Sequence, residues 1–451
     1  MAPLFGLDRF ALVWFEVPVG SLEETSEDIS VYLKLVSRRP ILKPKEGRTV
    51  LPMNLMQAIC RTALCAVLLP LSTAWASLPT NRVDFWNQSV AHPEMDLVRS
   101  ARSSLDIEIY QMTDPDFRSA LRAAVNRGVI IRVVEEPAPL GAKCVPFFPA
   151  AISESSDCAD LRVLISEVRQ AGGVFVPFNK ASLCGQAGAQ CYEHGKMIIA
   201  DRSRGLVSTG NFDSTNFCNL ARSPSRCNRD FAVTTVDPEV VQPLLKVFES
   251  DLAGHAYDIR SIVTAQVESK VTVSPLSLDP LVQFIKSARH SIQVENQYLK
   301  EPTINAALMD AARAGLNVQV MTASVCAFGT PKPSVLAQWN QSYASFSSSG
   351  VKTRIFNAQM RVDGVPGYLH AKAIVVDGVR AWVGSVNGSS TATSDNREFG
   401  LFLDDSSSVQ NLASVLTQDF LDPASETWQE SASCTKDRHA SGSASPSLAG
   451  G

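Results

Sequence analysis

The pattern of hydrophobic and polar positions occurs twice along this chain of 451 residues. Residues 98–134 align with residues 285–321 at a constant offset of 187 and share eleven identities in 37 positions, where average composition gives about 2. In each copy, alternating apolar positions precede a run with apolar residues at i, i+3, i+4, i+7 and i+8. A second apolar run follows, at 129–134 and 316–321. Each copy therefore predicts a strand, a helix and a parallel strand joined by a right-handed crossover.

The ends of the two predicted helices carry the same residue types. Proline stands in the first turn of each helix, as Pro115 and Pro302. Glycine follows each helix, as Gly128 and Gly315, and supplies the left-handed conformation that ends a helix. The shared helix ends indicate that the repeat is a repeated fold and not a similarity in composition alone. They predict two similar α/β halves.

A second repeated block, at 192–231 and 368–399, carries polar side chains in register. Each copy reads His-x-Lys, four residues and Asp, with an Asn 17 residues after the His and an Asn-Arg-acid-Phe string further on. The eight candidate catalytic residues are His194, Lys196, Asn211 and Asp230 in the first copy, and His370, Lys372, Asn387 and Glu398 in the second.

These residue types predict phosphodiester chemistry without a metal. Residues two apart on a strand project from one face, so each His is expected beside its own Lys. Two halves that face each other would gather both imidazoles, one to attack phosphorus and one to protonate the leaving oxygen. The lysines and asparagines would hold the non-bridging oxygens. The acids Asp230 and Glu398 would orient the imidazoles.

The second motif resembles that of the phospholipase D superfamily, H-x-K-x4-D-x6-G-S-x-N. It is complete at His370, Lys372, Asp377, Gly384, Ser385 and Asn387. The first motif has Ser208-Thr209-Gly210-Asn211 where the family has G-S-x-N, which we interpret as a permutation of the small residue and the hydroxyl. The segment Glu295-Asn296-Gln297-Tyr298 also resembles one in the second half of phospholipase D enzymes, and the resemblance covers most of residues 85–425.

The resemblance implies an α/β fold of two phospholipase D-like α/β/α sandwich halves, related by a pseudo-two-fold axis, with the active site at their interface. It implies a covalent phosphohistidine and no cofactor, with His194 as nucleophile and His370 as acid. The motif residues Asp201 and Asp377 would be structural, in agreement with their expected positions in turns.

The leading functional hypothesis is an exported phospholipase D. It would hydrolyse glycerophospholipids at a membrane or micelle surface to phosphatidate and the free head-group alcohol. Transphosphatidylation would be a second reaction of the same enzyme. The alternatives are a secreted metal-independent endonuclease with the same chemistry and a catalytically silent binding relative. The 41 basic and 45 acidic residues favour lipid, although single-stranded nucleic acid needs only a local basic groove. No obligate protein partner is indicated.

The first part of the chain predicts export. The apolar run at 62–71 is shorter than the ~20 residues that span a bilayer, and Arg61 before it and Ala74-Trp75-Ala76 after it are typical of a signal peptide. A buried apolar helix is the alternative interpretation. The expected segments are an upstream extension (1–52), the signal peptide (53–76), the N-terminal half (77–256), a linker (257–279), the C-terminal half (280–430) and a disordered tail (431–451).

Eight cysteines follow the predicted signal peptide, an even number that suits a secreted or periplasmic disulfide protein. Cys184 with Cys191 and Cys218 with Cys227 are plausible pairs, but sequence leaves the connectivity open. The insert at 141–190 contains Val145-Pro-Phe-Phe-Pro. It would either touch lipid or form a disulfide-tied loop over its own core.

Overall fold

The computed structural model describes residues 83–88, 91–140, 144–148, 155–184 and 191–437. The predicted extension at 1–52 and the predicted signal peptide at 53–76 lie outside the described residues. In the described part of the chain, no helix is both long and apolar enough to cross a membrane.

The N-terminal half is built on a seven-stranded sheet with the order β1-β8-β6-β5-β2-β3-β4. Strands β2, β3 and β4 are parallel to one another, as the crossover pattern predicted, and the remaining neighbours pair antiparallel. The strands are β1 (Val83–Asn87), β2 (Ser104–Ile109), β3 (Ile130–Glu135), β4 (Val174–Pro177), β5 (Lys196–Ala200), β6 (Arg204–Ser208) and β8 (Phe231–Thr235).

The C-terminal half repeats this topology strand for strand. Its order is β12-β11-β10-β15-β16-β17-β9, with β10, β11 and β12 parallel. The strands are β9 (Val271–Val273), β10 (Ser291–Asn296), β11 (Asn317–Ala323), β12 (Lys352–Phe356), β15 (Lys372–Val376), β16 (Arg380–Gly384) and β17 (Phe399–Leu403). The two predicted α/β halves are confirmed.

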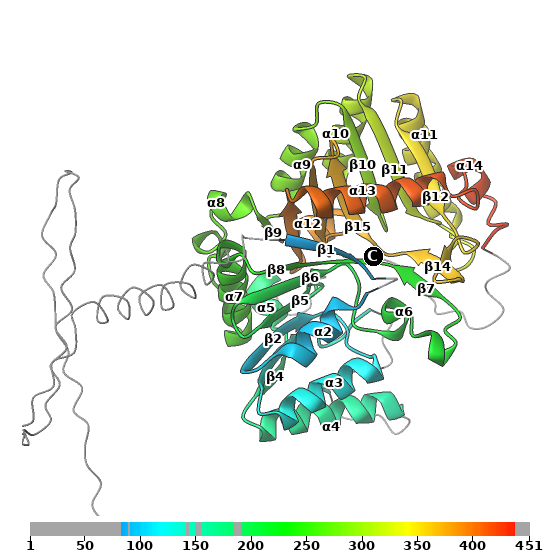
Figure 1. The fold of residues 1–451 in the computed structure, drawn as a ribbon. Helices are drawn as coiled ribbons and strands as arrows, with labels where there is room; N and C mark the ends of the chain where they lie inside the picture. Colours follow the sequence, from blue (N-terminus) through cyan, green and yellow to red (C-terminus); the bar gives the residue numbers. More distant parts are fainter. Residues whose placement is uncertain (1–82, 89–90, 141–143, 149–154, 185–190, 438–451) are drawn as a thin grey trace, which may run out of the picture. The chain divides into compact units, whose positions relative to one another are not determined.

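Four long helices accompany each sheet in equivalent places. In Figure 1, α3 and α4 lie at the bottom of the view and α10 and α11 at the top, outside the two sheets. The helices are α2 (Pro93–Ser100), α3 (Pro115–Asn126), α4 (Ser156–Gln170) and α7 (Pro238–Ala253) in the first half, and α9 (Leu278–Lys286), α10 (Pro302–Arg313), α11 (Pro333–Ser348) and α13 (Ser406–Leu421) in the second. Gly128 and Gly315 follow α3 and α10 with φ of 83° and 91°, as predicted.

Short helices occupy the connections: α5 (Lys180–Cys184), α6 (Ser214–Phe217), α8 (Ala265–Glu268), α12 (Ser390–Ser394) and α14 (Trp428–Ser431).

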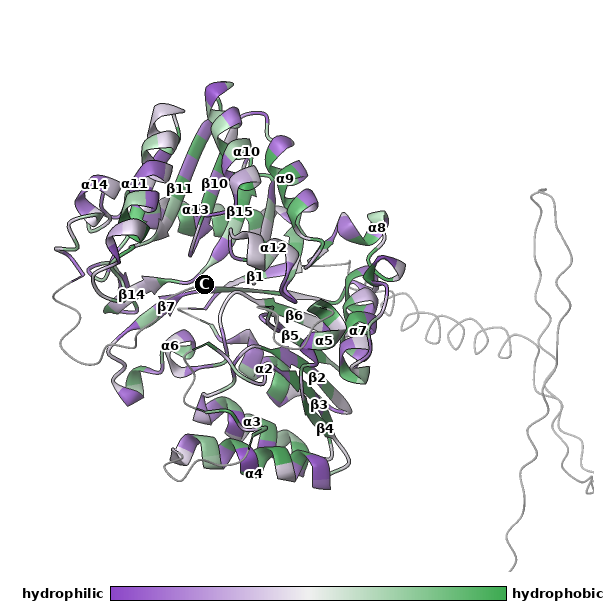
Figure 2. Ribbon diagram, turned by 180° about the vertical axis from the view of Figure 1, so that it is seen from behind, coloured by the Kyte–Doolittle hydropathy of each residue, from purple (hydrophilic) through white to green (hydrophobic). Residues whose placement is uncertain are grey.

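One apolar core is shared by the two halves. Buried residues of β5, β6 and β8 lie in the same cluster as buried residues of β15, β16 and β17, together with α7 and α13. The outer faces of the sheets pack on their own helices in two separate clusters. Figure 2 shows hydrophobic colouring along β2, β3 and β4 and mixed colouring on α4, whose outer side faces water. Because the central core needs both sheets, each half buries its inner face only against the other.

A small third sheet also joins the halves. It contains β13 (Arg361–Val362), β14 (Val365–Leu369) and β7 (Cys227–Arg229). Strand β14 of the second half pairs in parallel with β7 of the first, with Leu369 opposite Arg229. This pairing places the residue before His370 against the Asn-Arg-acid string of the other half.

Two predicted segment boundaries are corrected by the structure. Part of the predicted linker at 257–279 forms β9, which pairs with β17 and completes the second sheet. The predicted disordered tail at 431–451 is folded as far as residue 437. The reason is a disulfide between Cys434 and Cys326, which ties this segment to the loop after β11. Residues 438–451 lie outside the described residues.

Four disulfides use all eight cysteines that follow residue 76: Cys144–Cys158, Cys184–Cys191, Cys218–Cys227 and Cys326–Cys434. The two pairs expected from sequence are confirmed. In the insert, Phe147 packs at 6.0 Å from the buried Phe175 ring, while Phe148 is 49% exposed. For Phe147, this favours the interpretation of a disulfide-tied loop over the core.

Candidate active site

Each histidine is held by the backbone of the opposite half. The His194 amide donates to the carbonyl of Arg397 at 2.9 Å, and the His370 amide donates to the carbonyl of Arg229 at 3.0 Å. The histidines lie just before β5 and β15, which begin at the motif lysines, and not inside the strands as predicted. The correction has a physical reason, since both histidine segments leave their own sheet to pair with the other half.

The acids are exchanged between the halves. The Nδ1 atom of His194 lies 2.9 Å and 3.0 Å from the two carboxylate oxygens of Glu398. The Nδ1 atom of His370 lies 3.0 Å from Oδ1 of Asp230. Both carboxylates are fully buried. When the Nδ1–H of a neutral imidazole donates a hydrogen bond to the carboxylate, the free lone pair is on Nε2. Nε2 is then the nitrogen that can attack or transfer a proton.

The two motif lysines are completely buried beside the imidazoles. Each ammonium donates to the carbonyl of its own motif histidine, and Lys372 also donates to the Thr209 carbonyl of the other half at 3.2 Å. Burial lowers the pKa of Lys196 to about 8 and that of Lys372 to about 7. Both lysines therefore carry a charge at mildly acidic pH, ready to bind an anion.

Each motif histidine lies within the electrostatic influence of the lysine of the other motif. Burial lowers the pKa of His194 to about 4, against the raising effect of Glu398, and Lys372 of the other half adds to the lowering. Burial also lowers the pKa of His370, with contributions from its own Lys372 and from Lys196. Because each imidazole is influenced by the lysine of the opposite motif, the two motifs share one electrostatic environment of two lysines and two carboxylates.

The predicted asparagines have unused polar atoms. Asn211 follows β6 and Asn387 follows β16. The Oδ1 atom of each is buried and lacks a hydrogen-bond partner among the described residues. Buried amide oxygens are normally satisfied, so these two are available to a ligand or a water molecule.

The first motif is substituted, not permuted as predicted. The Thr209 hydroxyl accepts from the Phe231 amide at 2.9 Å, just as the Ser385 hydroxyl accepts from the Phe399 amide at 3.0 Å. The hydroxyl has therefore kept its place. Thr209 additionally donates to Asp230 at 2.6 Å, which no contact of Ser385 reproduces among the described residues.

The motif aspartates are structural, as the resemblance implied. Both have a positive φ, 52° for Asp201 and 55° for Asp377. The Asp201 carboxylate accepts from the amides of Arg102 and Ser103, and the Asp377 carboxylate accepts from the corresponding segment at 289–291. They close turns at the far end of the strands from the histidines.

Sequence reasoning missed a reciprocal pair of buried ion pairs. Arg397 meets Asp251 on α7 at 2.7 Å, and Arg229 meets Asp419 on α13 at 2.7 Å. Each arginine comes from one half and each aspartate from the other. We name these four residues the arginine clasp. The available sequence signal is the arginine that stands between the Asn and the acid in both strings.

Aromatic side chains next to the histidines were also missed. The Tyr110 ring lies 4.7 Å from the His194 ring, centre to centre. The Tyr368 ring lies 6.4 Å from the His370 ring. Tyr368 is two residues before its histidine, as Tyr192 is in the first half, and this shared position was the available signal.

Comparisons with known proteins place the chain in a family. A family model described as "Cardiolipin synthase, PLD-like domain" matches residues 95–252 and 281–420. A comparison with curated protein sequences finds no match. Among solved structures, phosphatidylserine synthase from Haemophilus influenzae Rd KW20 superposes with a TM-score of 0.52 at 13% identity, covering 77% of this chain and 88% of that one.

A second solved structure, the phospholipase D family member Nuc from Salmonella typhimurium, matches 39% of this chain and 96% of its own, with 18% identity and a TM-score of 0.26. The likeness to the synthase concerns the fold. The family model, however, covers both halves and both motifs. This chain belongs to the phospholipase D superfamily of phosphodiester-acting enzymes, as a member with both motifs in one polypeptide.

Proposed function

We propose that this protein is a phospholipase D that cleaves the distal phosphodiester bond of glycerophospholipids through a phosphohistidine at His194. The observation that carries the proposal is the crossed pairing of two imidazoles with two buried carboxylates, one from each half. Such pairing presents two Nε2 atoms of fixed tautomer beside two buried ammonium groups, the set that an in-line displacement at phosphorus needs.

In the first step, Nε2 of His194 forms a bond to phosphorus while the bond from phosphorus to the head-group oxygen breaks. The lowered pKa of His194 keeps this imidazole neutral and nucleophilic above about pH 4. The positive charge that develops on it is stabilised by Glu398. Protonated His370 donates its Nε2 proton to the departing oxygen.

In the second step, water replaces the alcohol. Neutral His370 takes a proton from the water, whose oxygen forms the new bond to phosphorus as the bond to His194 breaks. Lys196 and Lys372 hold the non-bridging oxygens throughout, together with the side-chain amides of Asn211 and Asn387. A second alcohol in place of water gives transphosphatidylation by the same steps.

Exposed apolar side chains on both sides of the site support a lipid substrate. Leu140 is 49% exposed, and its backbone amide donates to the hydroxyl of Tyr110, whose ring packs on His194. On the other side, Phe328 is 37% exposed and packs on Tyr368. A rim of this kind suits contact with an acyl or headgroup interface.

The four disulfides support a secreted or periplasmic location, because disulfides persist in oxidising compartments.

Incubation of the purified protein with phospholipid micelles, in the presence of EDTA, tests the function. We expect release of phosphatidate and free alcohol, and loss of that release in His194→Ala. A single-stranded oligonucleotide serves as the competing substrate. Cleavage of the oligonucleotide with intact lipid would favour the endonuclease over the phospholipase D. Cleavage of neither substrate would favour a catalytically silent binding relative.

A further inference from the structure

A cluster of aromatic rings surrounds one arginine on the His370 side of the site. The guanidinium carbon of Arg226 lies 4.8 Å from the centre of the Phe328 ring and 5.0 Å from that of Tyr368. The hydroxyl of Tyr298 lies 3.5 Å from the hydroxyl of Tyr368, and the Gln297 amide donates to both. The rings of Phe328 and Tyr368 therefore lie against Arg226, and Gln297 and Tyr298 extend the cluster through Tyr368.

The place of this cluster defines what it would contact. Tyr368 lies next to His370, the residue that protonates the leaving alcohol in the proposed reaction. The cluster also reaches solvent, since Phe328 and Tyr298 are 37% and 36% exposed. A group held here would therefore belong to the departing head group, on the opposite side of phosphorus from His194.

The corresponding place in the first half differs in charge balance. There, Lys180 lies over the Tyr192 ring at 4.2 Å and forms an ion pair with Glu136 at 2.7 Å. No carboxylate pairs with Arg226 among the described residues, although the arginine is half-buried. A half-buried guanidinium without an acid binds anions readily, and its planar fork matches a carboxylate or a phosphate.

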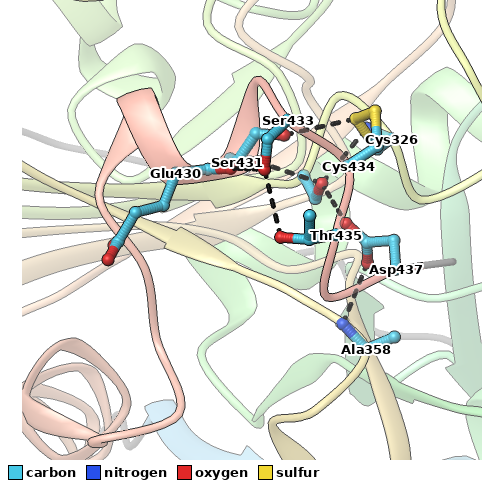
Figure 3. Close-up of a disulfide and its surroundings, with 9 residues drawn as sticks. Cys326, Ala358, Glu430, Ser431, Ser433, Cys434, Thr435 and Asp437 are labelled. Carbon is cyan, nitrogen blue, oxygen red and sulfur yellow. Dashed lines mark hydrogen bonds between the residues drawn. A yellow bond between two sulfur atoms is a disulfide. The ribbon is translucent and has the colours of Figure 1, made fainter. Parts of the chain in front are cut away.

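Two disulfides hold the walls of the cluster. Cys227, next to Arg226, is bonded to Cys218. Cys326, two residues before Phe328, is bonded to Cys434, and Figure 3 shows this bond together with the Asp437 carboxylate that accepts from the Ala358 amide at 3.1 Å. Arg226 and Phe328 therefore each lie within two residues of a disulfide, which limits their freedom before a ligand arrives and reduces the entropy lost on binding.

We propose that Arg226, framed by Tyr298, Phe328 and Tyr368, is a head-group subsite for a carboxylate or phosphate on the alcohol side of the scissile bond. The subsite rests on the proposed function and selects anionic over choline head groups. A quaternary ammonium would need the aromatic faces that Arg226 already covers, and it would be repelled by the guanidinium.

Phosphatidylserine and phosphatidylethanolamine test the subsite, because they differ by one carboxylate. We expect the wild-type protein to have a higher kcat/KM for the serine lipid in mixed micelles. Arg226→Gln should lower the serine-to-ethanolamine ratio by about tenfold, the effect of losing one charge-assisted hydrogen bond. Arg226→Lys, which keeps the charge, should retain part of the ratio. An unchanged ratio in Arg226→Gln would overturn the subsite.

Arg222→Gln is the matched control. Arg222 lies four residues earlier, is exposed and pairs with Asp116 at 2.6 Å. It should leave the ratio at the wild-type value. Thermal unfolding of each variant establishes whether it is folded. If Arg226→Gln does not fold, the ratio measured for Arg226→Lys still decides the test.

Two further measurements separate the subsite from the reaction itself. Bis(p-nitrophenyl) phosphate lacks a charged head group, so its hydrolysis reports the proposed chemistry alone. If no diester is hydrolysed, calorimetric binding of O-phosphoserine against O-phosphoethanolamine still judges the subsite. Tighter binding of O-phosphoserine that is lost in Arg226→Gln supports it, and equal binding overturns it. Loss of oligonucleotide cleavage in Arg226→Gln, with neither lipid cleaved, would overturn the head-group assignment in favour of a nucleic-acid phosphate.

Discussion

The two halves carry nearly the same motif but give their histidines different surroundings. His194 contacts both oxygens of Glu398 and packs on Tyr110. His370 contacts one oxygen of Asp230, which also accepts from Thr209. Each imidazole thus differs from the other in its acid, its neighbours and its hydrogen bonding, and the proposed nucleophile and acid are chemically distinct although their sequences match.

The exchange of acids explains why both halves are needed. An isolated half would present an imidazole without its carboxylate, a carboxylate without its imidazole and half of the arginine clasp. A buried charge without its partner is costly, so the interface is energetically coupled to the site. The comparison between halves can be tested by breaking the histidines, then the clasp, then the acids.

Replacing either histidine should have the largest effect. We expect His194→Ala and His370→Ala each to lower kcat on lipid by about 10⁴-fold or more. On bis(p-nitrophenyl) phosphate, the leaving group needs no protonation, so His370→Ala should still form the histidine adduct and accumulate it. Mass spectrometry should detect the adduct in His370→Ala and not in His194→Ala, and the opposite pattern would mean that the two roles are exchanged.

Breaking the arginine clasp should lower stability next. Asp251→Asn and Asp419→Asn each leave a buried arginine without its carboxylate, and we expect each to reduce the free energy of unfolding by about 3–5 kcal/mol. Asp251→Asn should reduce the free energy of unfolding more than Asp419→Asn. The side chains of Arg397 and Asp251 are 2% and 0% exposed, against 10% and 9% for Arg229 and Asp419. Chemical denaturation measures both.

The control for the clasp is Asp310→Asn, at an ion pair with Arg313 whose side chains are 70% and 56% exposed. Its effect should stay below about 1 kcal/mol. Equal effects of the control and the clasp variants would show that the clasp does not couple the halves.

Neutralising the acids should have the smallest effect and the clearest signature in pH. We expect Asp230→Asn and Glu398→Gln each to lower kcat by about 10²-fold. Asp230 raises the pKa of His370, which must be protonated. Asp230→Asn therefore moves the alkaline limb of kcat/KM to lower pH. Glu398 raises the pKa of His194, which must be neutral. Glu398→Gln therefore moves the acid limb, near pH 4 in the wild type, to lower pH.

The pH profile of kcat/KM for each variant checks this assignment. If both substitutions moved the same limb, the acids would not be exchanged in the functioning enzyme.

The sequence predicted the elements and the motif residues, and individual residues show where such prediction ends. Alternating and helical periodicity located β2, α3 and β3 and their counterparts, because side-chain direction repeats every two or every 3.6 residues. Matching strings located all eight candidate residues. Periodicity could not place His194 outside its strand, since that position depends on a hydrogen bond to Arg397 in the other half.

The sequence by itself determined the duplication, the motif residues and the class of chemistry, because these are written in short strings and local repeats. Tertiary structure alone decided that Glu398 serves His194, that Asp230 serves His370, and that Arg226 has no acid beside it in the part of the chain that the structure describes. These contacts join residues 204 and 140 positions apart. Only the packing of one sheet on the other brings them together.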